Sequence, residues 1–407
     1  LGAIASAALW RHAESERERA ALSAEIGASL FVLADGEYEN RSSRQLTQRL
    51  QERLPGDAAR QAAVLADYVA ALDGRSAGIR RFGLRAAVIE AFGNDYRRAV
   101  IAKLREAGDA HSLLFAAQLA WMLQEDTGSD EDVARALVAA VAAAPASKEA
   151  LFVAATYCPR GDDALPTRCA VADAAQRLVE VDADNGFAWM LLATQVAPAK
   201  AAAMVHEAAA RERIDDYYSA LRLEFADAIV ATGVPLPPQL AVAFALPGED
   251  AAVVFADDQV WMSPDTFSHR IGWICDPARN PALDAALRAD CRALALRLNA
   301  ARGSIGTTML GSSIIRRLEP GSPLAAQMVA QRRTMIYRRE TLARTRRNES
   351  AGVRLRAQWF RDYAGHSELD LLGKALVERG RPADPPPDWQ PNDPRMMELP
   401  ENRPKPR

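Results

Sequence analysis

The residues of this chain best placed to do chemistry are its four cysteines, which form two close pairs along the sequence: Cys158 with Cys169, and Cys275 with Cys291. An even number of closely spaced cysteines favours disulfides, which persist in oxidising compartments such as the bacterial periplasm. Zinc binding is not expected, because neither pair has the short C-x-x-C spacing and no nearby histidine completes a site. We therefore expect two disulfides and no metal; the alternative is four reduced thiols in a cytosolic protein.

The elements expected around each pair decide whether its sulfurs can meet. Residues 148–157 and 170–181 are expected to be antiparallel helices joined by a short loop, which places Cys158 beside Cys169. Pro281 favours a helix start, and an unbroken helix from there would carry Cys291 about 15 Å along its axis. Pairing of Cys275 with Cys291 therefore requires a break near residues 288–290, or a crossing angle that folds the helix back.

No other motif indicates catalysis. The metalloprotease pattern H-E-x-x-H begins at His206, but Ala210 occupies the place of its second histidine. There is no phosphate-binding glycine loop and no nucleophile elbow. Asp215 and Asp216 could do acid–base chemistry, although Asp215 fits better as a helix N-cap. We expect no catalytic, cofactor-binding or metal-binding residues; an all-α enzyme without a recognisable local motif stays an alternative.

Residues 316–361 are rich in arginine, with twelve arginines and three glutamates in this stretch. The centre of this stretch is a candidate basic patch formed by Arg332, Arg333, Arg338, Arg339, Arg346 and Arg347. Such a patch could neutralise nucleic-acid phosphates or acidic lipid headgroups. The other interpretation is a solvated face paired with acidic residues elsewhere, because the net charge of the chain is −3.

Length and composition predict an all-α fold. The chain has 407 residues, more than a single core usually holds. It is rich in alanine, the best helix former, and poor in the β-branched and aromatic residues of strands. Periodicity and turn signals predict short helices that pack as antiparallel hairpins in series. The expected helices cover residues 3–33, 43–54, 57–72, 77–92, 94–107, 110–124, 129–144, 147–158, 167–181, 185–196, 199–211, 214–232, 264–275, 281–301, 304–318, 322–348, 350–362 and 366–379.

A degenerate repeat runs through residues 110–232. Trp189, Leu192, Ala193 and Val196 have the spacing of a repeated helix signature. Matching positions are held by Val153, Ala154 and Tyr157 in one earlier helix and by Ala117, Gln118 and Trp121 in another. This stretch resembles the tetratricopeptide repeat family. The resemblance implies an α-solenoid with a concave peptide-binding groove, in which Trp121 and Trp189 belong to the core.

Five segments are expected along the chain. Residues 1–33 form an N-terminal helix whose apolar start fits the remnant of a signal sequence or membrane anchor. Helical hairpins follow at 34–108, the repeat-like helices at 109–232 and a further helical region at 233–380. Residues 381–407 are rich in proline and are expected to form a disordered tail. Its Trp389 and the pair Met396-Met397 could instead strap onto the body or onto a partner.

These observations predict a non-catalytic helical-repeat protein that binds another protein in the bacterial cell envelope. It would be periplasmic, with a membrane anchor ahead of the first residue as one option. The alternative is a binder of nucleic acid or of an anionic membrane surface that uses residues 316–361, in which case the protein could be cytoplasmic. No cofactor is expected in either case.

Overall fold

The computed structural model describes residues 48, 50, 52, 57–71, 77–124, 130–157, 171, 173–244, 252, 255, 271–301, 303–348, 367–392 and 394–397. These residues are predominantly helical, and one isolated β-bridge, between Asn185 and Arg213, occurs among them. The prediction of an all-α fold is confirmed. Within the described ranges, every helix is too short or too polar to cross a membrane.

The chain divides into two compact units, each assembled from three stretches. Unit 1 comprises Leu1–Lys103, Ile229–Ala256 and Arg344–Ala357, and unit 2 comprises Leu104–Ala228, Asp257–Ala343 and Gln358–Arg407. Local sequence signals do not indicate this grouping, since it depends on contacts between distant parts of the chain. The five expected segments stay predictions.

Unit 1 is built around a contact between helices far apart in sequence. Helix α3 (Ala58–Ala71) packs on the short helix α12 (Pro238–Phe244), which sequence reasoning missed. A hydrogen bond of 2.6 Å from Gln239 Nε2 to Gln61 Oε1 joins the two helices. Because α12 has only two turns, this tertiary packing stabilises it more than its own propensity does.

Helix α4 (Ala77–Ala107) is continuous, so the expected break at Gly93 is wrong. Arg97 donates a hydrogen bond to the side chain of Asn94 within the helix, and its guanidinium group lies 5.7 Å from the ring centre of Phe255. The same phenylalanine ring packs edge-on against Tyr96. These contacts stabilise the helical turn that follows Gly93, a residue type that sequence rules treat as a breaker.

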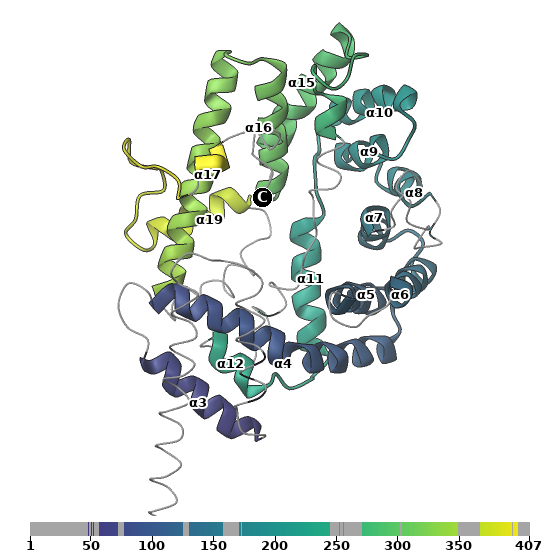
Figure 1. The fold of residues 1–407 in the computed structure, drawn as a ribbon. Helices are drawn as coiled ribbons and strands as arrows, with labels where there is room; N and C mark the ends of the chain where they lie inside the picture. The colour runs from purple at the N-terminus through teal and green to yellow at the C-terminus, as the bar shows by residue number, and fades with distance from the viewer. Residues whose placement is uncertain are drawn as a thin grey trace, which may run out of the picture. The chain divides into compact units, whose positions relative to one another are not determined.

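Unit 2 contains a series of short helices that follow one another in space as they do in sequence (Figure 1). They are α5 (Ala110–Gln124), α6 (Asp130–Ala143), α7 (Lys148–Tyr157), α8 (Ala174–Val181), α9 (Gly186–Ala193) and α10 (Pro198–Ala210). Each helix packs on the next one in the chain. We call α5 to α10 the tandem helices. Apart from the start of α8, their bounds agree with the predicted ones to within three residues.

The core of the tandem helices is aromatic. Phe152 of α7 lies 4.9 Å from Tyr217 and 6.0 Å from Phe187 of α9, measured between ring centres. Phe115 of α5 packs 5.1 Å from Phe225 of α11 (Tyr218–Ala231). All five rings are almost completely buried. Tilted ring pairs at these distances add to the stabilisation that comes from burial alone.

Unit 2 contains further helices after the tandem helices and α11. These are α15 (Ala285–Ala300), α16 (Ile305–Leu318), α17 (Pro323–Asn348) and α19 (Glu368–Val377), followed by the 3₁₀ turn η1 (Pro394–Met397). Helix α15 packs on both α10 and α16. A buried cluster beside α17 and α19 contains Ile305, Met335, Tyr337, Leu342, Leu372, Ala375 and Leu376.

Candidate functional site

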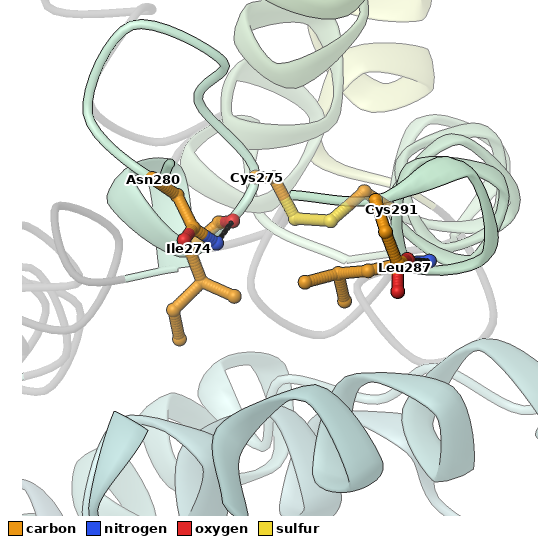
Figure 2. Close-up of a disulfide and its surroundings, with 6 residues drawn as sticks. Ile274, Cys275, Asn280, Leu287 and Cys291 are labelled. Carbon is orange, nitrogen blue, oxygen red and sulfur yellow. Dashed lines mark hydrogen bonds between the residues drawn. A yellow bond between two sulfur atoms is a disulfide. The ribbon is translucent and has the colours of Figure 1, made fainter. Parts of the chain in front are cut away.

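The disulfide between Cys275 and Cys291 is formed, with Cα atoms 5.6 Å apart and both residues fully buried (Figure 2). Helix α15 begins at Ala285, so the expected helix start at Pro281 is wrong. The Asp284 carboxylate caps the helix by accepting a hydrogen bond of 2.8 Å from the N–H of Leu287. The later start leaves enough chain before the helix for the two sulfurs to meet.

The loop between the two cysteines is folded by its own side chains. Asn280 Nδ2 donates to the carbonyl oxygen of Ile274 at 2.7 Å (Figure 2). Its Oδ1 accepts from the N–H of Ala282 at 3.0 Å. These bonds turn the chain back toward α15, so no break inside that helix is needed. Cys158 and Cys169 lie outside the described residues, and their pairing stays a prediction.

Replacing both Cys275 and Cys291 by alanine should lower the free energy of unfolding by about 3 kcal/mol, because the bridge closes a loop with a sequence separation of 16. Denaturant titration of the oxidised proteins measures this difference. Added reductant should bring the wild-type chain close to the double variant in the same reductant. An unchanged denaturation midpoint in the double variant would show that the bridge contributes nothing to stability.

Asp216 is buried and caps a distant helix. Its Oδ2 accepts hydrogen bonds from the N–H of Ser304 at 2.8 Å and from Thr307 Oγ1 at 2.6 Å, at the start of α16. Glu368 adds a second carboxylate there by accepting from the N–H of Ile305 at 2.8 Å. Negative charge at a helix N-terminus is favourable, so the geometry gives Asp216 a structural role instead of the acid–base role considered from the sequence.

A polar network centred on the buried Asp182 joins α7, α8, α9 and the chain before α11. Lys148 Nζ contacts Asp182 Oδ1 at 2.6 Å, and Arg213 donates to the same oxygen. Oδ2 accepts from Tyr217 Oη at 2.7 Å and from Asn185 Nδ2 at 3.1 Å. We call these five residues the Asp182 network. Sequence reasoning missed it, and the only local signal was the cluster of polar residues between expected helices.

The electrostatics of the network hold Asp182 in its charged form. Burial alone would raise its pKa, but hydrogen bonds from Lys148, Tyr217 and Asn185 together with the charge of Arg213 lower it below its ordinary value. Burial, together with the bond to Asp182, raises the pKa of Tyr217 above its ordinary value. Two cations, a phenol and an amide thus satisfy both carboxylate oxygens, so the network fits a structural role between helices.

The amide of Asn185 extends the network into the backbone. Its Oδ1 accepts from the N–H groups of Phe187 at 3.1 Å and Asp215 at 2.9 Å, and its Nδ2 donates to the carbonyl of Asp215 at 2.9 Å. Asp215 Oδ1 accepts from the N–H of Tyr217 at 2.9 Å, and α11 begins one residue later. Asp215 is therefore not the helix N-cap that we expected. Its side chain closes a turn just before α11.

Helix α17 carries the predicted basic patch, and arginines of this patch bind the end of the same chain. Arg333 donates from Nη2 to the carbonyl oxygens of Pro386 at 2.7 Å, Pro387 at 3.0 Å and Trp389 at 2.7 Å. The chain turns at this point, where the N–H of Trp389 also donates to the carbonyl of Pro386. A single guanidinium group thus fixes a turn in residues 381–397, which we call the tail segment.

The neighbouring side chains extend these contacts in both directions along the tail segment. Arg338 donates from Nε to the carbonyl of Ala383 at 2.9 Å, and Tyr337 Oη donates to the carbonyl of Pro382 at 3.1 Å. At the other end, Arg332 Nε donates to the carbonyl of Met396 at 2.5 Å. The carboxylate of Glu340 accepts from the N–H of Asn392 at 3.1 Å. We call Arg332, Arg333, Tyr337, Arg338 and Glu340 the tail-binding face.

Trp389 anchors the tail segment on an apolar surface. Its indole lies edge-on to the ring of Tyr337, with ring centres 5.3 Å apart and an interplanar angle of 82°. It packs against the buried cluster beside α17 and α19. The guanidinium group of Arg333 lies 5.8 Å from the indole centre, within cation–π range. The side chain is therefore held by both apolar and charged neighbours.

Disorder of the tail is thus not confirmed for residues 381–392 and 394–397, which lie along α17 (Figure 1). The alternative expectation, that the tail packs against the rest of the chain, accounts for these contacts. Of the predicted basic patch, Arg332, Arg333 and Arg338 come together on the tail segment, whereas Arg339 is exposed. The side chains of Arg346 and Arg347 lie outside the described residues.

The repeat-like positions divide between core and surface. Leu192 and Ala193 are buried, as are Val153 and Ala154. Trp189, expected in the core, is only half-buried: its Nε1 donates to the carbonyl of Ala183 at 2.8 Å. The side chain of Trp121 lies outside the described residues.

Comparisons with protein-family models, with curated proteins and with solved structures found no match to this chain. A functional assignment therefore has to be argued from the residues and contacts described above.

Proposed function

We propose that this chain is a non-catalytic helical-repeat protein of the bacterial cell envelope that binds another protein. The observation that carries the proposal is the series of tandem helices, in which every helix packs on the next. Arrays of this kind expose a long surface made of repeated helix faces, which suits the binding of a protein or peptide. A tetratricopeptide-like solenoid is the specific form of array that we propose.

The envelope location is supported by the bridge between Cys275 and Cys291, since a buried disulfide is compatible with an oxidising compartment. The competing function, binding of polyanions by the arginine-rich stretch, has less support. Arg332, Arg333 and Arg338 are engaged with carbonyl oxygens of the tail segment, and bound guanidinium groups contribute less to phosphate binding.

Site-specific photo-crosslinking in the native host tests this function. Probes at Glu180 on α8 and Lys200 on α10, both exposed, should each give a covalent adduct with the same envelope protein. A probe at exposed Ala300, at the end of α15, is the matched control and should give less of that adduct. Absence of a defined adduct at both tandem-helix positions, or equal adducts at all three, would contradict the proposal.

A further inference from the structure

The contacts of the tail segment are those of a ligand bound to a receptor surface. Its carbonyl oxygens accept from Arg333, Arg338 and Tyr337, three side chains that project from one helix. Residues 382–392 make a single backbone hydrogen bond among themselves, from Trp389 to Pro386. The tail-binding face therefore determines the conformation of the tail segment, much more than the segment's own secondary structure does.

Proline suits this mode of binding for a physical reason. It has no N–H, so a proline-rich chain leaves fewer backbone donors that need a partner when it lies on a protein, while its carbonyls remain good acceptors. It also adopts an extended conformation before binding, which lowers the entropy lost on docking. Pro386 and Pro387 present their carbonyls to Arg333 while their rings are exposed.

A tryptophan and the charge pattern distinguish the tail segment from other proline-rich segments that the tail-binding face could meet. Trp389 is the one large apolar side chain of residues 381–392, and it packs against Tyr337. Arg338 forms an ion pair of 3.3 Å with Asp384, whose side chain is 79% exposed. The face thus combines an aromatic anchor with cations aimed at carbonyls, and it fits a proline-rich segment with an acidic residue before the prolines and a tryptophan after them.

We propose that the tail-binding face is a receptor surface for extended, proline-rich, tryptophan-containing segments of a partner protein, and that the chain's own tail segment occupies it until such a partner displaces it. The inference rests on the proposed protein-binding function and adds a second surface to it, separate from the tandem helices. A tethered segment competes at an effective concentration on the order of millimolar, so a partner has to bind more tightly than the tail segment to displace it. A free copy of the tail segment itself binds poorly unless the tethered copy is weakened.

The test is binding of a fluorescent peptide with the sequence of residues 381–397 to the full chain, measured by fluorescence anisotropy. Trp389→Ala in the chain weakens the tethered copy and should raise the affinity for the added peptide at least tenfold relative to the wild-type chain. Pro386→Gly combined with Pro387→Gly, at two exposed positions, should act in the same direction through the lost preorganisation and does not remove a buried side chain.

Two control variants decide whether the peptide occupies the proposed face. Adding Arg333→Ala to either tail variant should abolish the gain, whereas adding Arg339→Ala, which removes an exposed charge from the same helix, should preserve it. Equal affinity of the wild-type chain and both tail variants would overturn the proposal, as would equal losses from Arg333→Ala and Arg339→Ala. Crosslinking at the tandem helices would still succeed in those cases, so failure of the two proposals can be distinguished.

Discussion

Asp182→Ala should lower the free energy of unfolding by about 2–4 kcal/mol, the largest loss among the single substitutions that we predict. The carboxylate is 3% exposed and receives hydrogen bonds from Lys148, Arg213, Tyr217 and Asn185. Its removal leaves two cations and a buried phenol without their common acceptor. Denaturant titration monitored by circular dichroism measures the change.

Asp184→Ala is the matched control, since Asp184 is an exposed carboxylate two residues further along the chain. We expect a change of less than about 0.5 kcal/mol there. Equal and small effects at the two positions would mean that the Asp182 network does not hold the tandem helices together.

The same network predicts a defined dependence of stability on pH. The pKa of Asp182 is lower in the folded chain than its ordinary value near 4, so the unfolded chain takes up the proton first. The contribution of Asp182 is therefore complete well above pH 4 and is lost as the pH falls through that value toward the folded-state pKa. In Asp182→Asn this part of the acid-dependent loss of stability should disappear.

Gly311→Ala should destabilise the protein by about 2 kcal/mol, although alanine is the better helix former. Gly311 lies within α16 at a point where its backbone is close to α15. A Cβ atom there would lie 2.5 Å from the carbonyl oxygen of Ala295 and 3.0 Å from Cβ of Leu298. The backbone of α15 would have to move, and thermal or denaturant unfolding measures the cost.

Gly93→Ala is the control, and its expected effect on stability has the opposite sign. Gly93 also lies inside a helix, but an added Cβ would meet only side-chain atoms at 3.4 Å or more, from Ile89, Phe255 and Arg97. The substitution should stabilise the protein by up to about 1 kcal/mol, because alanine loses less backbone entropy on folding. A stabilising effect at Gly311 would contradict the close approach of α15 and α16.

The helices could be predicted from the sequence because their signals are local. Helix α17, for example, begins at Pro323 and ends at Asn348, one residue after the expected start and at the expected end. Capping residues such as Ser304 act within one turn, and Ser304 indeed accepts from the N–H of Thr307. Where a long-range contact overrides the local signal, as Phe255 does at Gly93, the prediction failed.

The Asp182 network and the tail-binding face could not be predicted in the same way. Lys148 lies 34 positions from Asp182, and Arg333 lies 53 positions from Pro386. Neither pairing leaves a periodic pattern in the sequence. The prolines of the tail indicate correctly that no α-helix forms in residues 381–392, but they do not reveal that carbonyls there meet guanidinium donors on another element.

The claim on which this account most depends is that the arginines of α17 bind the chain's own tail segment. Fluorine NMR of the protein labelled with 5-fluorotryptophan measures this directly, with Trp389 assigned by its loss in Trp389→Phe. We predict a Trp389 resonance displaced from the random-coil position by the ring of Tyr337 and the guanidinium group of Arg333. It should move toward that position in Arg333→Ala and stay in place in Arg339→Ala. A random-coil resonance in the wild-type chain would contradict the account.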